Sequence, residues 1–209
     1  PIFEFGVSTE TGNSLVGQAR DNVIVQAQEW GADYCFFWDD DMIFRRDTLL
    51  RLWRNQKPVC AALAFTAREP IGPVLFKFKR TWDPTRHCEA LDREPIFDYP
   101  RDTLFQLDGV GSGVLLIDMS VFKKLPRPWF HGAIGAGEDI HFSWSCFRSG
   151  VEIWCDTRVK TAHVPNETPR WMNEEYYLKT RGNGADDCGR DLQELPAACG
   201  LSDLAHAAR

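Results

Sequence analysis

Three consecutive carboxylates, Asp39, Asp40 and Asp41, directly follow an apolar run at residues 34–38. Such a run predicts a buried strand, and acids at a strand end are typical of a site at a sheet edge. Like charges about 4 Å apart cost roughly 1 kcal/mol in water and more near a protein interior, so a bound cation would compensate them. Because side chains alternate along an extended chain, Asp39 and Asp41 would share one face as an Asp-x-Asp pair for a hard cation. The alternative is a solvated turn that leads into the next helix.

Composition narrows the class of protein. With 209 residues, of which 44% are hydrophobic and 12% aromatic, the chain is expected to form one globular domain with a real core. The net charge of −6 argues against a nucleic-acid partner, because neutralising phosphates requires a basic face. Any phosphate that binds here is expected to be bridged by a metal.

The cysteines and the hydropathy pattern predict the compartment. The chain has seven cysteines, no C-x-x-C pair, and several cysteines inside apolar runs. An odd number cannot all pair internally, so a reducing compartment is the simplest account. The sequence has no apolar stretch of membrane-spanning length and no signal pattern, which predicts a soluble, cytoplasmic chain without a transmembrane segment.

Strands and helices are expected to alternate around these acids. The expected strands cover residues 3–7, 34–38, 58–66, 74–78, 114–117, 151–155 and 159–164, and the expected helices cover 19–30, 48–53, 120–125, 138–148 and 171–179. Residues 81–101 are rich in proline and charge and are interpreted as a surface excursion. The small-residue loop at 132–137 has the composition of a mobile element near a site. The alternation predicts an α/β fold with a mostly parallel sheet.

Several short stretches occur in an order that resembles the GT-A-fold, nucleotide-sugar-dependent glycosyltransferases, especially the family 2-like group. They are Ala19–Asn22, Phe36–Met42, Gly109–Gly113 before an apolar strand, Pro128–Phe130, Gly137–Ile140, and Trp154–Asp156 leading to His163. No single stretch is specific, but the ordered set is. The resemblance implies a GT-A-like (Rossmann-like) domain over residues 1–164, with helices flanking the sheet and a small antiparallel excursion. Residues 165–209 would form a carboxyl-terminal helical extension.

The resemblance also implies how a donor would be held. Asp41 would be the direct metal ligand, His163 a further protein contact to the metal, and Asp39 a contact to the ribose or to the metal through water. Asp40 would support the donor, and Arg20 would lie near the nucleotide. Oxygen and imidazole ligands with open positions suit Mn²⁺ or Mg²⁺, and the imidazole favours Mn²⁺. The ordinary alternatives are a strand-end histidine and a solvated arginine at a helix start.

Catalysis and acceptor binding are implied at other positions. Asp139 would be the general base that takes a proton from the acceptor hydroxyl, and Glu138 would bind acceptor hydroxyls or orient the base. Acids at a helix amino terminus also simply complement the helix dipole. Trp129 would stack on an acceptor sugar, although a core position is the ordinary alternative. Backbone close to the sugar or acceptor would come from Gly111, Ser112 and Gly113, or these residues would form a tight bend into a strand.

These expectations combine into a metal-dependent glycosyltransferase. It would move a sugar from a uridine or guanosine diphosphate sugar to a hydroxyl acceptor with inversion. The acceptor could be a glycan, a lipid or a small molecule. Only about 33 residues precede the acid-bearing strand, so the first nucleotide-binding strand is either missing or replaced by residues 3–7. The alternatives are a metal-dependent nucleotidyltransferase and a non-catalytic sugar- or nucleotide-binding module of the same fold.

Overall fold

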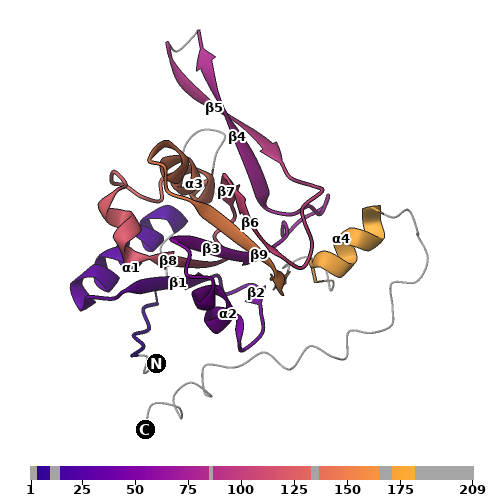
Figure 1. Cartoon of the computed structure of the whole chain (residues 1–209), viewed down its shortest axis with the longest axis horizontal. Helices are drawn as coiled ribbons and strands as arrows, with labels where there is room; N and C mark the ends of the chain where they lie inside the picture. Colours follow the sequence, from indigo (N-terminus) through magenta and orange to yellow (C-terminus); the bar gives the residue numbers. More distant parts are fainter. Residues whose placement is uncertain (1–3, 10–14, 85–86, 133–136, 165–170, 182–209) are drawn as a thin grey trace.

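The computed structural model describes residues 4–9, 15–84, 87–132, 137–164 and 171–181 (Figure 1). Its four α-helices within these ranges are α1 (Val16–Trp30), α2 (Thr48–Arg54), α3 (Glu138–Arg148) and α4 (Glu174–Arg181), with a short 3-10 helix at Met119–Lys123. The strands are β1 (Tyr34–Trp38), β2 (Met42–Ile43), β3 (Val59–Leu63), β4 (Leu75–Asp83), β5 (Cys88–Pro95), β6 (Leu104–Leu107), β7 (Gly109–Val110), β8 (Val114–Asp118), β9 (Ile153–Lys160) and β10 (Ala162–His163).

The central sheet has five strands in the order β1-β8-β3-β9-β6. Strands β3 and β9 pair in parallel, whereas β1–β8, β3–β8 and β6–β9 pair antiparallel. The predicted α/β class is therefore confirmed, with a correction to the sheet. β1, β3 and β9 run in one direction, but the reversed strands β8 and β6 make the sheet mixed rather than mostly parallel.

Two smaller sheets extend this core. Strands β4 and β5 form a long antiparallel hairpin, and β7 pairs with β4 at its base. The hairpin projects from the body in Figure 1 and accounts for the predicted antiparallel excursion. Strand β10 pairs with β2, opposing His163 to Met42. That short pairing joins the turn after β1 to the end of β9, which are far apart in sequence.

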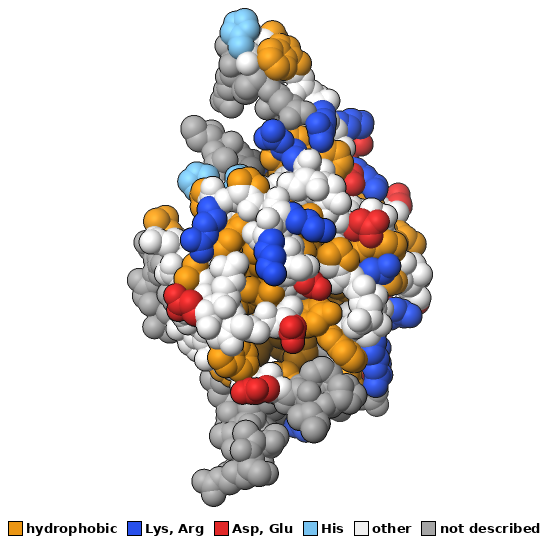
Figure 2. Space-filling model, turned by 60° about the vertical axis from the view of Figure 1, so that its left-hand side comes forward, with side chains coloured by type: hydrophobic (Ala, Val, Ile, Leu, Met, Phe, Trp, Pro, Cys, Tyr) orange, Lys and Arg blue, Asp and Glu red, His pale blue; other side chains and the backbone are white. Residues whose placement is uncertain are grey.

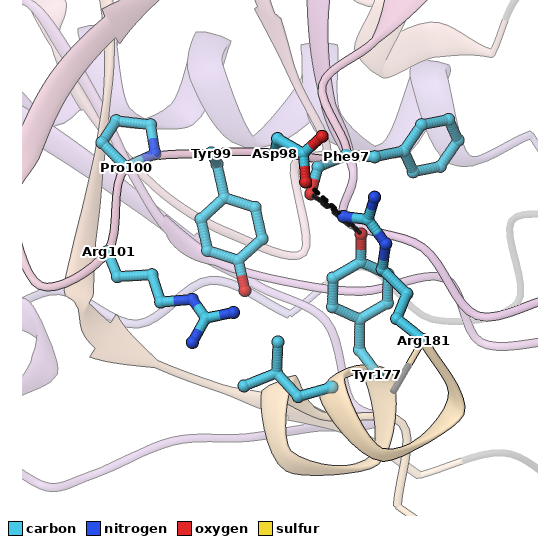
Figure 3. A pocket seen from close by; sticks show the side chains of 8 residues that line it. Phe97, Asp98, Tyr99, Pro100, Arg101, Tyr177 and Arg181 are labelled. Carbon is cyan, nitrogen blue, oxygen red and sulfur yellow. Dashed lines mark hydrogen bonds and ion pairs between the residues drawn. The ribbon is translucent and has the colours of Figure 1, made fainter. Parts of the chain in front are cut away.

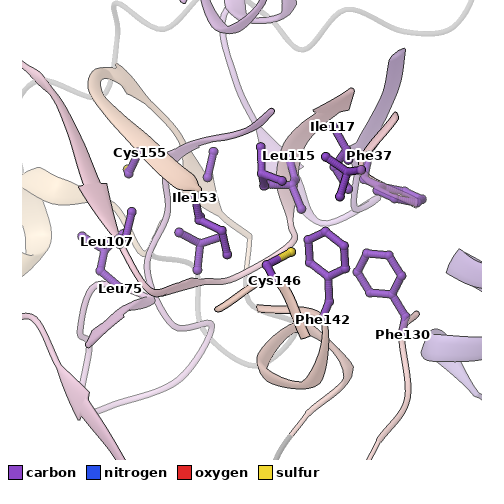
Figure 4. Packing of buried hydrophobic residues seen from close by; sticks show 14 of the residues in the cluster. Phe37, Leu75, Leu107, Leu115, Ile117, Phe130, Phe142, Cys146, Ile153 and Cys155 are labelled. Atoms are coloured by element: carbon purple, nitrogen blue, oxygen red, sulfur yellow. The ribbon is translucent and has the colours of Figure 1, made fainter. Parts of the chain in front are cut away.

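The core lies on both faces of the central sheet. Alternation along β1 places Cys35 and Phe37 in the larger apolar cluster, while Phe36 packs against the smaller one beside α2. On the larger side, the rings of Phe130 and Phe142 stack with centroids 4.5 Å apart, next to Phe37 (Figure 4). Helix α3 is held to the sheet by these rings, so its amino terminus has a fixed position.

Most predicted elements are confirmed, with small shifts in their ends. Helix α1 begins at Val16 and ends at Trp30, and the capping residue Gly31 has a φ of 79°. Such a left-handed residue at a helix end favours glycine. The strand predicted at residues 3–7 is wrong, because residues 4–9 form no strand in the structure. Among the described strands, none pairs with residues 4–9. The division of the chain after residue 164 stays a prediction.

The described cysteines and helices bear on the expected compartment. Cys35, Cys60, Cys146 and Cys155 are buried free thiols. Burial raises the pKa of Cys35 to about 12, so this thiol stays protonated and unreactive. Among the helices that the structure describes, none is both long and apolar enough to cross a membrane.

Candidate functional site

Arg20 lies at the centre of the candidate site. Its side chain is buried on α1, and its guanidinium lies 5.2 Å from the ring centroid of Phe37 and 5.9 Å from that of Phe130. One terminal nitrogen donates to both carboxylate oxygens of Asp39, at 2.7 and 2.9 Å. The structure thus brings Arg20 and Asp39 together. Arg20 holds Asp39, and its expected position near a nucleotide stays a prediction.

Glu138 and Asp139 form the first turn of α3, as predicted. The Arg20 Nε lies 3.6 Å from a carboxylate oxygen of Glu138, so the same arginine faces acids from two elements. Asp139 Oδ1 accepts a hydrogen bond of 2.7 Å from the backbone N–H of Ile140. Helices α1 and α3 approach closely because Gly17 has no side chain. A Cβ at that position would lie 2.4 Å from the carbonyl oxygen of Phe130.

Two carboxyl groups of this cluster have raised pKa values. Burial raises the pKa of Asp39 above 3.8, and the neighbouring Asp41 and Glu138 add to the rise, whereas Arg20 opposes it. Burial also raises the pKa of Asp139, and the charge of Glu138 adds to it. A base with a raised pKa accepts a proton more readily at neutral pH. The electrostatics therefore suit proton transfer at Asp139.

Asp41 and His163 meet across the fold. His163 Nε2 lies 3.1 Å from Asp41 Oδ2, and His163 Nδ1 lies 2.9 Å from the carbonyl oxygen of Phe65. A carbonyl oxygen only accepts, so Nδ1 must be the protonated nitrogen. In a neutral ring, Nε2 then has a lone pair and no proton. Nε2 and Asp41 Oδ2 are both acceptors, so a proton or a cation between them is needed to make this distance favourable.

The distance between Asp41 Oδ2 and His163 Nε2 fits two ligands of one divalent cation. Adjacent ligands of an octahedral ion at about 2.1 Å stand roughly 3 Å apart, close to the observed separation of the two atoms. A histidine that donates its other N–H to a backbone carbonyl is the usual arrangement at metal sites. The Asp41 side chain is 43% exposed, which leaves room for further ligands. Asp41 and His163 can therefore supply two ligands to Mn²⁺ or Mg²⁺.

Asp39 does not join that pair. Residues 39–41 form a turn rather than an extended segment, and the N–H of Met42 donates to the carbonyl of Asp39 at 3.1 Å. The expected shared face of Asp39 and Asp41 is thus corrected: Asp39 contacts Arg20, and Asp41 contacts His163. Within the described ranges, no three His, Cys, Asp or Glu residues are grouped to hold a metal. Asp40 is exposed on the turn, and the contacts of Asp39 and Asp40 with a donor stay predictions.

The glycine-rich segment and Trp129 have mainly structural surroundings. A Cβ at Gly111 would lie 2.8 Å from Val74, and Ser112 is buried. Gly113 lies beside the site: its carbonyl accepts from the Asp39 N–H at 2.9 Å, and a Cβ there would lie 3.5 Å from Asp39 Oδ2. Trp129 is 3% exposed and packs on Phe122, with Arg127 over its ring. The expected stacking of Trp129 on a sugar is therefore corrected to a core position.

Some residues that shape the site carry no signal in the sequence. Asp21 accepts from the backbone N–H of Phe130 at 2.9 Å and so fixes the ring under Arg20. The Phe65 carbonyl orients His163, and the Phe65 ring lies 5.3 Å from that of Tyr177. Any side chain could offer such a carbonyl, so residue type alone does not reveal it. Residues 133–136 of the predicted small-residue loop lie outside the described residues.

A cavity of about 370 Å³ lies between α4 and residues 97–101 (Figure 3). Arg181 closes one side, donating to Asp98 at 2.6 Å and to the carbonyl of Phe97 at 3.0 Å. Tyr177 on α4 lines the cavity and also packs on the Phe65 ring. None of the predicted site residues lines this cavity.

Comparisons with known proteins add little to this geometry. No protein-family model and no curated protein matches the chain. The solved structures that resemble it include the crystal structure of A197 from STIV and that of GalNAc-T7 with UDP, GalNAc and Mn²⁺. The first has a TM-score of 0.48 and 17% identity, covering 72% of this chain and 68% of the other. The second has a TM-score of 0.48 and 13% identity, covering 77% of this chain and 33% of the other. Neither likeness is strong enough to assign a function.

Proposed function

We propose that the chain is a GT-A-like, metal-dependent glycosyltransferase that moves a sugar from a nucleoside-diphosphate donor to a hydroxyl acceptor, with inversion. The observation that carries the proposal is the contact of Asp41 with His163 beside the buried Arg20 and the partly exposed acids Asp39 and Glu138. A site with two protein ligands suits a cation that takes its remaining ligands from a diphosphate and water. A bound Mn²⁺ or Mg²⁺ would stabilise negative charge on the departing diphosphate.

The side chains of the chain have separate roles in the proposed reaction. Asp139 accepts the proton of the acceptor hydroxyl while the hydroxyl oxygen bonds to the anomeric carbon of the sugar. The bond from that carbon to the diphosphate oxygen breaks, and its electron pair leaves with the diphosphate. Arg20 keeps Asp39 in place, and Asp39 is assigned to the ribose of the donor. Glu138 orients the acceptor beside the base.

Binding and turnover test the proposal separately. A thermal-shift screen of nucleoside diphosphates, with and without Mn²⁺, is expected to show stabilisation by one diphosphate only when the metal is present. The absence of a metal effect with every diphosphate would refute the donor site. Asp139→Asn is then expected to retain that stabilisation while losing at least about a hundredfold in turnover of the sugar donor. Unchanged turnover in this variant would exclude Asp139 as the base.

A further inference from the structure

The two faces of the β4–β5 hairpin differ in what they contact. In the strand register, Phe78 opposes Arg93, and Lys79 opposes Asp92. Because side chains alternate, Phe78 and Arg93 lie on one face of the hairpin, and Lys79 and Asp92 lie on the other. The Phe78 ring packs on α3, 5.9 Å from the ring of Trp144. Arg93 thus belongs to the face that is turned toward the helix that begins with Glu138 and Asp139.

We call the face with Lys79 and Asp92 the outer face and the face with Phe78 and Arg93 the inner face. The charges on the outer face neutralise one another. Lys79 pairs with Glu94, and Lys77 lies 3.9 Å from Asp108. On the inner face, the Arg93 guanidinium lies over the Phe76 ring at 5.7 Å, and its side chain is exposed. No carboxylate of the described residues lies within ion-pair distance of Arg93. Figure 2 shows Lys and Arg side chains gathered where the hairpin leaves the body.

The Arg93 charge reaches the proposed base. Burial raises the pKa of Asp139, and Arg20 and Arg93 both counter that rise. Arg20 is occupied by Asp39, whereas Arg93 is exposed to solvent. Of these two arginines, Arg93 is the one that an incoming molecule can contact.

We propose that Arg93 binds an anionic group of the acceptor, a carboxylate or a phosphate, and so selects acidic acceptors. The inference rests on the proposed transferase function and names its acceptor class. A guanidinium presents several donors in a planar fork that matches both groups. Farther along the same face, Trp82 is 64% exposed, roughly 13 Å beyond Phe78 at the rise of a strand. An elongated acceptor would thus meet a cation first and then an aromatic ring.

Binding of small probes tests the inference without turnover. Glucose, glucose 6-phosphate and glucuronate are titrated into the chain and followed by nuclear magnetic resonance. At low ionic strength, at least one acidic probe is expected to bind about tenfold more tightly than glucose, as loss of one charge-assisted contact implies. The two acidic probes distinguish a phosphate from a carboxylate. Failure of both to bind more tightly than glucose would overturn the inference.

Variants on the two faces of the hairpin locate the effect. Arg93→Gln is expected to remove the preference for the acidic probe, and Arg93→Glu is expected to reverse it. Lys79→Gln is the matched control, because it removes a cation from the outer face of the same hairpin. It is expected to leave the preference unchanged. Equal losses in Arg93→Gln and Lys79→Gln would show a general field effect and contradict the assignment.

The nucleotide screen separates this inference from the proposed function. Metal-dependent binding of a nucleoside diphosphate, together with no preference for acidic probes, would leave the transferase proposal standing and overturn the role of Arg93. The opposite result would be a preference for acidic probes that depends on Arg93, together with no metal-dependent binding of a nucleoside diphosphate. The anion site would stand, and the transferase proposal would fall.

Discussion

The contact of Arg20 with Asp39 makes a quantitative prediction about stability. The Arg20 side chain is 7% exposed and that of Asp39 is 36% exposed, so the arginine is much the more buried partner. Breaking a fully buried ion pair costs about 3–5 kcal/mol, because the remaining charge is left uncompensated. Water screens part of the Asp39 charge, so we expect Arg20→Met to lower the free energy of unfolding by about 2–3 kcal/mol.

A double-mutant cycle isolates the interaction from other effects. Methionine keeps apolar contact with the rings of Phe37 and Phe130, so most of the loss should come from the uncompensated carboxylate. Asp39→Asn removes that carboxylate. Combining the two changes should therefore cost less than the sum of the single variants, by about 1.5 kcal/mol or more.

Urea unfolding of the wild type, both single variants and the double variant provides the four free energies. Circular dichroism in the native baseline checks that each variant folds. A loss below about 0.5 kcal/mol in Arg20→Met, or strictly additive effects, would refute the claim that Arg20 holds Asp39.

Two further predictions concern pH and packing. Because the pKa of Asp139 is raised from 3.8, the folded state binds more protons at this group than the unfolded state, so the group lowers stability as pH rises from that value through the raised pKa. Asp139→Asn should thus gain stability relative to the wild type between about pH 4 and neutrality in thermal unfolding, and an equal difference at both ends would contradict this. Gly17→Ala should lower the free energy of unfolding by roughly 1–3 kcal/mol, because the new Cβ meets the Phe130 carbonyl. Inside a helix, the same change usually stabilises by about 1 kcal/mol. Any gain in the free energy of unfolding would exclude that clash.

The sequence was most informative where a strong pattern had a strong physical cause. The apolar run at residues 34–38 is a strand because its side chains pack on both faces of the sheet. The helix from Glu138 follows its predicted bounds because its apolar residues recur at helical spacing and pack on the sheet. By contrast, the weak alternation at residues 3–7 predicts a strand that is not there.

The site was predictable only in part, because its contacts depend on topology. His163 lies beside Asp41, 122 positions earlier, through the pairing of β10 with β2. The resemblance brings the two residues together, but the sequence does not reveal the turn that separates Asp39 from Asp41. The partner of Asp39 is a buried arginine, and no local pattern distinguishes that contact from solvent exposure. The Phe65 carbonyl that orients His163 is likewise independent of residue type.

The central claim is that Asp41 and His163 hold a divalent cation, and pulsed electron paramagnetic resonance of bound Mn²⁺ tests it directly. The untagged chain is measured with Mn²⁺ alone and with uridine or guanosine diphosphate. Nitrogen coupling from one imidazole is expected in the wild type, and loss of that coupling is expected in His163→Gln. Bound Mn²⁺ without nitrogen coupling, or coupling that persists in His163→Gln, would contradict it.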